Sequence, residues 1–235
     1  QLPAARRPSD NVFYTVMGLI AAATVFWGFS ATFYLREAAP PGLPLLHIVH
    51  GTAFTSWFLL FIIQTLLITA NRRDLHRSLG LMTALLAACM VVLGLIAAID
   101  ALRRGSAPVP GLDPRSFFAV PIGDMVTFPV LVGAGVYFRR NPEAHKRLML
   151  LACISILSAA IARIPLAFVK AGGPVAFFGL MDLLILIAFA YDFVTRRRVH
   201  PAYLWGGLLV LLSQPLRLLV SRTAAWLWFA DLFPS

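Results

Sequence analysis

Two histidines, His47 and His50, are the residues whose type and spacing most directly suggest chemistry in this sequence. They lie three positions apart, so in a helix both imidazoles share one face. They stand at the head of an apolar run, Thr52 to Ala70, that is long enough to cross a bilayer. Ionisable side chains at membrane depth are costly, and they are candidates for function. The question is then which other polar residues can reach this pair.

The composition indicates the environment of these residues. The chain is 60% hydrophobic and only 13% charged, with a mean hydropathy of +0.82. A soluble domain is about 45–50% apolar and about 25% charged. The sequence therefore predicts an all-α integral membrane protein with a single domain, 1–235, and the lipid bilayer as its partner. Cys89 and Cys153 lie inside apolar runs and show no metal-binding spacing.

Seven apolar runs reach about the 20 residues that a spanning helix requires. They cover residues 12–35, 47–70, 78–100, 117–138, 148–170, 176–195 and 203–222. After the first run, each turn at one face has an arginine pair followed by a histidine: His76, His145 and His200. This pattern predicts a polytopic bundle of seven transmembrane helices, one helix plus three hairpins. The tail from Thr223, with two tryptophans, suits a membrane interface.

Basic residues predict the orientation of these spans. Twelve of the 20 Lys and Arg residues precede the first span or follow the second, fourth and sixth. The positive-inside rule then places this face and the N-terminus in the cytoplasm, and we expect a bacterial inner membrane. Because the net charge of +10 sits in short clusters between apolar runs, it reflects topology, and no nucleic-acid partner is expected.

Several other polar residues fall at one depth in the outer half of the predicted bundle. Counting along each span at 1.5 Å per residue brings them level with the two histidines. These residues are Asp124, Arg163, Asp182, Gln214 and Arg217. Prolines 121, 165 and 215 lie beside them, and interrupted helices next to buried charges are common in membrane binding sites. The pattern predicts a polar cavity that opens outward, or alternatively ion pairs that only hold the helices together.

Three chemical interpretations remain open. In the first, His47, His50, Asp124 and Asp182 bind Zn or Fe, while Arg163, Gln214 and Arg217 hold an anionic ligand. In the second, a haem lies between histidines of two helices, for which the inner residues His76 and His145 are placed best. In the third, no cofactor is bound, and the protein is a transporter, chaperone or accessory subunit.

The sequence also resembles known membrane proteins. The run His47–Gly51 and the segments FTSWFLLFIIQTLLI, RRDLHRSLG, PEAHKRLMLLA and SQPLRL resemble a widespread, largely uncharacterised family of bacterial seven-helix membrane proteins. The segment LHRSLG after HG…FTSW resembles b-type transmembrane cytochromes, and EAHKRLML is similar to proteins that assist haem A or cytochrome oxidase maturation. These resemblances imply His50, His76 and His145 as ligands of haem b. The four-histidine cytochrome pattern is incomplete, because spans three to five contain no second outer histidine.

We therefore expect a buried polar site that binds a cofactor or small ligand, with a haem or redox role associated with respiratory complexes as the leading hypothesis. A metal-dependent membrane enzyme is the first alternative. An accessory subunit, bound to other membrane subunits and without catalysis of its own, is the second. The sequence leaves open whether the protein is an enzyme.

Overall fold

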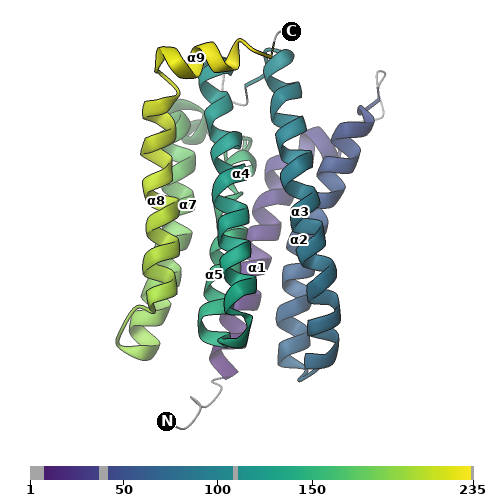
Figure 1. Ribbon diagram of the computed structural model, residues 1–235, viewed down its shortest axis with the longest axis vertical. Coiled ribbons are helices and arrows are strands. Elements are labelled where there is room, and N and C mark those ends of the chain that lie inside the picture. Colours follow the sequence, from purple (N-terminus) through teal and green to yellow (C-terminus); the bar gives the residue numbers. More distant parts are fainter. Residues whose placement is uncertain (1–7, 37–41, 108–110, 234–235) are drawn as a thin grey trace.

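The computed structural model describes residues 8–36, 42–107 and 111–233. Throughout these ranges the regular structure is helical, with no β-strand. Seven of the helical segments are long and apolar enough to cross a membrane. They run alternately up and down the bundle (Figure 1). The predicted all-helical class and seven-span membrane bundle are confirmed.

The helix boundaries follow local start signals. Asp113, Asn141 and His200 each accept a backbone N–H as an N-cap and are followed by proline, which suits the first helical position. The elements are α1 (Pro8–Phe29), its π-helical continuation η1 (Ser30–Tyr34), α2 (Leu45–Thr69), α3 (Arg73–Arg103), α4 (Pro114–Tyr137), the 3₁₀ turn η2 (Phe138–Arg140), α5 (Pro142–Ser155), α6 (Ser158–Ile161), α7 (Ala167–Arg196), α8 (Pro201–Val220) and α9 (Ala224–Ala230).

The alternation of helices gathers the basic turns at one end of the molecule. The start of α1 and the turns α2–α3, α4–α5 and α7–α8 lie together at the bottom of Figure 1. We call this the basic end, and the other the opposite end. The clusters that begin at Arg72, Arg139 and Arg196 thus share one end, as predicted. That this end is cytoplasmic stays a prediction.

The fifth and sixth spans begin earlier than predicted. The fifth was expected at 148–170 but covers Pro142–Ile161, and Pro165 lies in the turn before α7, outside any helix. Charged residues near the start of α5 lie inside the bundle because partners from other helices neutralise them. In α7 the backbone breaks at Gly173 (φ 52°, ψ −133°), a conformation that favours glycine, and Pro174 follows the break.

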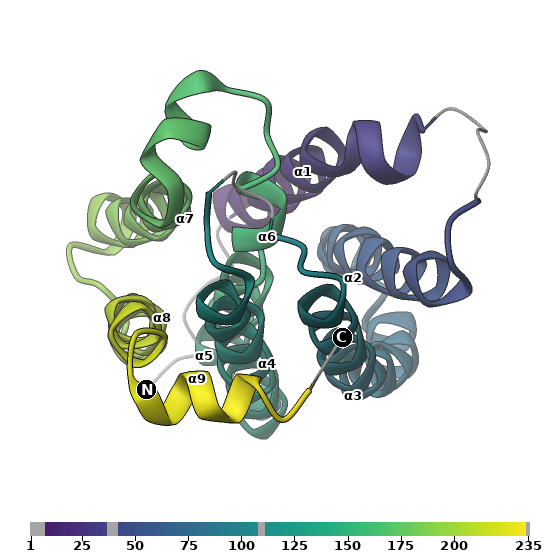
Figure 2. The same cartoon turned by 90° about the horizontal axis from the view of Figure 1, so that it is seen from above.

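Helix α5 is the centre of the bundle. It packs against α1, α4, α7 and α8, and every residue from Leu150 to Ser158 is buried (Figure 2). Gly28 of α1 permits a close approach to α6, because a Cβ there would overlap the Ala160 carbonyl oxygen. The C-terminal helix α9 lies across the opposite end (Figure 1), where the Trp226 ring is 5.7 Å from that of Phe118. That this helix lies at a membrane interface stays a prediction.

Candidate functional site

The histidines that open α2 lie at the opposite end of the bundle. His47 Nε2 is 3.0 Å from Arg104 Nη2 and 3.5 Å from Asp100, both at the end of α3. The His50 ring stacks on Phe54 with a centroid distance of 4.2 Å. Next to them, Gly51 brings η1 close, because a Cβ there would lie 2.5 Å from the Phe33 ring. His47 therefore faces α3 rather than the centre of the bundle.

The second polar group of the opposite half links α4 to α8. Arg217 Nη1 donates to Asp124 Oδ1 at 2.5 Å, and Arg217 Nη2 donates to Thr127 at 3.1 Å. The Ser158 hydroxyl, at the start of α6, donates to the other oxygen of Asp124 at 2.7 Å. Gly123 makes room for this pair, because a Cβ there would overlap Arg217 Nε. The predicted salt bridge between these spans is present, and it is buried.

Two further residues predicted for this cluster make other contacts. Asp182 of α7 accepts a hydrogen bond from Gln214 of α8 at 2.7 Å. Arg163, in the turn after α6, donates to the Ala159 carbonyl oxygen at 2.8 Å and lies over the Phe29 ring at 4.9 Å. Arg163 thus takes no part in the Asp124–Arg217 pair.

The residues predicted to bind a metal are consequently not brought together. His47 contacts Asp100 of α3 and His50 stacks on Phe54 of its own helix, whereas Asp124 and Asp182 bond to two positions of α8. Within the described part of the chain, no group of three or more His, Cys, Asp or Glu side chains is placed to hold one ion. The physical reason is that depth along a helix does not determine the direction in which each helix turns its polar face.

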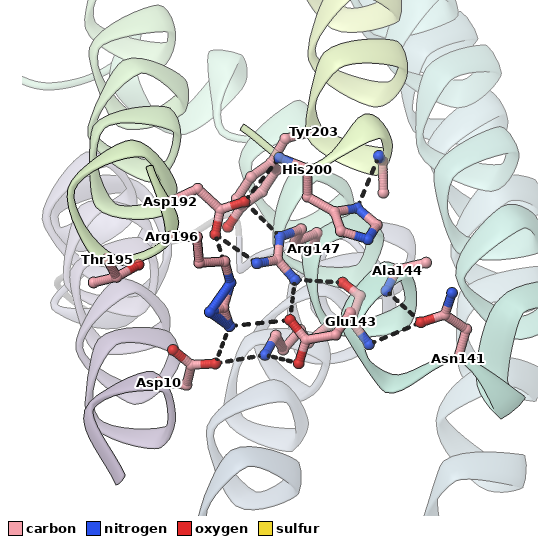
Figure 3. A network of polar contacts seen from close by, with 12 residues as sticks. Asp10, Asn141, Glu143, Ala144, Arg147, Asp192, Thr195, Arg196, His200 and Tyr203 are labelled. Atoms are coloured by element: carbon pink, nitrogen blue, oxygen red, sulfur yellow. Dashed lines mark hydrogen bonds and ion pairs between the residues drawn. The ribbon is translucent and has the colours of Figure 1, made fainter. Parts of the chain in front are cut away.

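A larger ionic network occupies the basic end and ties α1, α5 and α7 together (Figure 3). Its centre is Arg147, which is fully buried and forms a two-pronged contact with Asp192 at 2.7 and 2.5 Å. Arg147 also donates to Glu143 at 2.8 Å. Lys146 and Arg196 complete the network through Asp10, at 2.6 and 2.5 Å. Three acids and three bases balance each other, so the network is neutral.

Aromatic residues and one backbone amide enclose the network. Tyr203 of α8 lies under Arg147 at 5.4 Å and donates to the Tyr14 hydroxyl at 3.3 Å. The His200 backbone N–H donates to Asp192 at 3.1 Å. Because its charges are mutually paired, this network is suited to holding four helices together rather than to binding a ligand.

Sequence reasoning did not find this network, although a signal was present. Arg147 and Arg196 were interpreted only as topology-determining charges at the ends of spans. Glu143 and Arg147 are four residues apart in α5, and so are Asp192 and Arg196 in α7, which places each pair on one helix face. Acidic residues one turn from the arginines at the same membrane face would have indicated a neutralised cluster.

The inner histidines His76 and His145, from α3 and α5, meet at the basic end. Their ring centroids are 6.1 Å apart, with the rings edge to face at 89°. His145 Nδ1 is 2.8 Å from the Gly135 carbonyl oxygen, which can only accept, so Nδ1 carries the proton and Nε2 keeps a free lone pair. His50, the third residue implied as a haem ligand, begins α2 at the opposite end and does not join them.

Gln64 of α2 holds the other histidine. In the amide orientation that gives each end a partner, Gln64 Nε2 donates to His76 Nδ1 at 2.5 Å and Oε1 accepts from Gly80 N–H at 3.0 Å. The opposite amide orientation presents Oε1 to a proton on His76 Nδ1 instead. That second orientation also turns Oε1 towards the His76 carbonyl oxygen and Nε2 towards the Gly80 N–H, so the first one, in which His76 Nδ1 accepts, satisfies the amide better.

The two histidines line a cavity of about 70 Å³ between α2, α3, α4 and α5. This is room for about two waters at roughly 30 Å³ each. Trp57, Gln64, Thr83 and Met149 line the same cavity, and none of the lining residues is acidic. The arrangement combines two imidazoles held by hydrogen bonds with a methionine side chain, around a space the size of a small ion.

A bundle of seven spanning helices with a paired ionic interior defines the class: a multi-pass, all-helical integral membrane protein. No family model, curated protein or solved structure matches this chain.

Proposed function

We propose that this protein is a membrane-embedded metal-cofactor protein with a redox role, and that His76 and His145 hold the metal. The observation that carries the proposal is the hydrogen bond between His145 Nδ1 and the Gly135 carbonyl oxygen. Metal-binding histidines nearly always donate their other ring N–H to such an acceptor, which fixes the tautomer and directs the free nitrogen to the metal. Metal binding through His76 Nε2 requires the Gln64 amide to turn so that Oε1 accepts from His76 Nδ1–H, which gives up its hydrogen bond from Gly80 N–H.

The chemistry of the cavity favours a soft monovalent ion, Cu(I). The candidate ligands are the two imidazoles and Met149, a lining residue that lies one turn after His145 in α5. Thioethers prefer Cu(I), whereas Zn²⁺ and Fe²⁺ in a buried site are usually accompanied by anionic ligands that this cavity lacks. Trp57 also lines the cavity, and an indole is the side chain best suited to a cation–π contact. Bound copper would supply one-electron redox chemistry.

Haem b, which the resemblance to b-type cytochromes implies, does not fit between these histidines as the helices stand. Sites for ligands of that size occupy about 300–1,000 Å³, against about 70 Å³ here. Haem binding would require α3 and α5 to separate. An accessory role in a respiratory complex is compatible with a copper site, and it remains a prediction.

Copper titration of the purified protein tests the proposal. We expect the reduced protein to withdraw one equivalent of Cu(I) from a chromogenic chelator, and His145→Ala to abolish this. His47→Ala, at the opposite end, is the matched control and should keep full binding. If both His76→Ala and His145→Ala still bind copper, the site is refuted. If instead the parent protein shows a haem absorption band that both variants lose, the two histidines bind haem and not copper.

The residue behind His76 gives a second test. Gln64→Glu places an acceptor-only carboxylate against His76 Nδ1 and should preserve or tighten Cu(I) binding, whereas Gln64→Leu should weaken it by about 10- to 100-fold. Equal affinity of these two variants would show that Gln64 does not orient His76.

A further inference from the structure

A second and larger cavity lies on the other side of the α4–α5 hairpin. It is a groove of about 510 Å³ between α4, α5 and α8, and it shares no lining residue with the histidine cavity. Its walls are apolar and include Leu131, Ala134, Leu148 and Leu209. Trp205 on its rim is 74% exposed, on a spanning helix whose outward side meets hydrocarbon. The volume lies within the range of ligand sites, and the bilayer is the natural source of an occupant.

The basic end of this groove is polar. His200 and Asn141, which cap α8 and α5, both line it. His200 Nδ1 accepts the Ala202 N–H at 3.1 Å, so Nε2 carries the proton, and Figure 3 shows that nitrogen turned towards Ala144 and Asn141. Burial and the nearby Arg147 charge lower the pKa of His200, which keeps the ring neutral as a donor. Asn141 uses its oxygen for capping, which leaves its amide N–H groups to donate.

Unbalanced positive charge surrounds this polar end. Arg139 and Arg140 directly precede Asn141, and Arg197 and Arg198 come just before His200; all four are exposed. Among the described residues none of the four forms an ion pair with a carboxylate, because Asp10, Glu143 and Asp192 are engaged in the neutral network. The groove therefore offers hydrogen-bond donors at one end and an apolar channel at the other, and the four exposed arginines stand next to those donors in the sequence, although none of them lines the groove itself.

We propose that this groove binds one anionic phospholipid, with its phosphate held between Asn141, His200 and the two arginine pairs and an acyl chain laid along α4 and α8. Basic pockets between spanning helices are suited to anionic headgroups. A neutral isoprenoid quinone would use the apolar channel but would leave the arginine pairs without a counter-charge. From Leu131 to Asn141 the groove follows the helix for roughly 15 Å, enough for most of an acyl chain.

Native mass spectrometry of delipidated protein tests this proposal. Titrated with phosphatidylglycerol, the protein should retain one lipid at least about tenfold more strongly than phosphatidylcholine with identical chains. The variant Arg139→Gln/Arg140→Gln should lose about thirtyfold in phosphatidylglycerol affinity, as expected for two arginines at a charged headgroup. The matched control, Arg73→Gln/Arg77→Gln, removes the same charge from the same end but away from the groove, and it should bind like the parent.

A substitution that fills the apolar channel distinguishes lipid binding in the groove from nonspecific attraction of the lipid to a charged surface. Ala134→Phe places a ring in the groove and should abolish retention of the lipid while the helical circular-dichroism signal and the melting temperature, which check folding, stay those of the parent. Three outcomes would overturn the proposal. The Arg73/Arg77 control could lose as much phosphatidylglycerol affinity as the Arg139/Arg140 variant, or the parent could retain both lipids equally. Extracts of the parent could also contain a bound quinone in place of a phospholipid. None of these outcomes bears on the His76–His145 site.

Discussion

Arg147 is the buried charge on which the basic end depends most, and its replacement gives the sharpest prediction. The side chain is fully buried and faces Asp192, which is equally buried, at 2.7 and 2.5 Å. Arg147→Met keeps much of the volume but leaves the Asp192 carboxylate without its main partner. Breaking a buried pair in this way typically costs about 3–5 kcal/mol of unfolding free energy. For a chain of this length that is roughly 6–20 °C in melting temperature.

The double variant Arg147→Met/Asp192→Leu tests the cause of this loss. Removing both charges leaves no unpaired carboxylate, and Glu143 keeps Lys146 and Arg196 as partners. Replacing a buried pair by apolar residues is often neutral, so the double variant should recover most of the lost stability. Unfolding is followed by circular dichroism in detergent, with Arg72→Met, at the exposed pair with Asp74, as the control. A single variant as stable as the parent, or a double variant no better than the single, would refute the reasoning.

Three other predictions concern stability, pH and topology. Gly123→Ala should lower the unfolding free energy by about 1–3 kcal/mol because its methyl group meets Arg217. The control Gly133→Ala, in the same helix, places its methyl group in open space and should be neutral or stabilising. Equal effects of the two substitutions on stability would contradict this packing. Because the pKa of His200 is lowered in the folded protein, the unfolded chain gains a proton below about pH 6.5 that the folded protein does not, so stability falls as the pH drops below 6.5. His200→Asn, which still caps Ala202 N–H, should show a smaller fall, and an unchanged pH profile would exclude this contribution. Arg72→Cys, Arg139→Cys and Arg197→Cys should each be labelled from the same side of membrane vesicles, and a labelling pattern split between the two sides would refute the topology.

Much of the architecture was readable from the sequence. Seven apolar runs predicted seven spans, and the alternation of basic turns predicted a common basic end, because span length and hydrophobicity depend only on local composition. The N-cap and proline signals at Asp113, Asn141 and His200 are equally local. The fifth span was predicted too far along the chain because its first turns are charged, which is typical of a loop. Their partners on α1 and α7, which allow these charges inside the bundle, are visible only in the structure.

The partners of the buried polar residues were decided by the tertiary structure. Counting residues gives depth, which is why Asp124 and Arg217 were expected to meet, and they do. Depth alone also predicted that Arg163 joins this cluster. Its helix ends before it, however, and its side chain turns to Phe29. Likewise His76 and His145 were candidates as helix starts, but only the packing of α2–α5 places them on one cavity with Gln64 and Met149. Rotation of each helix about its axis follows from side-chain packing across the whole bundle, which no single span encodes.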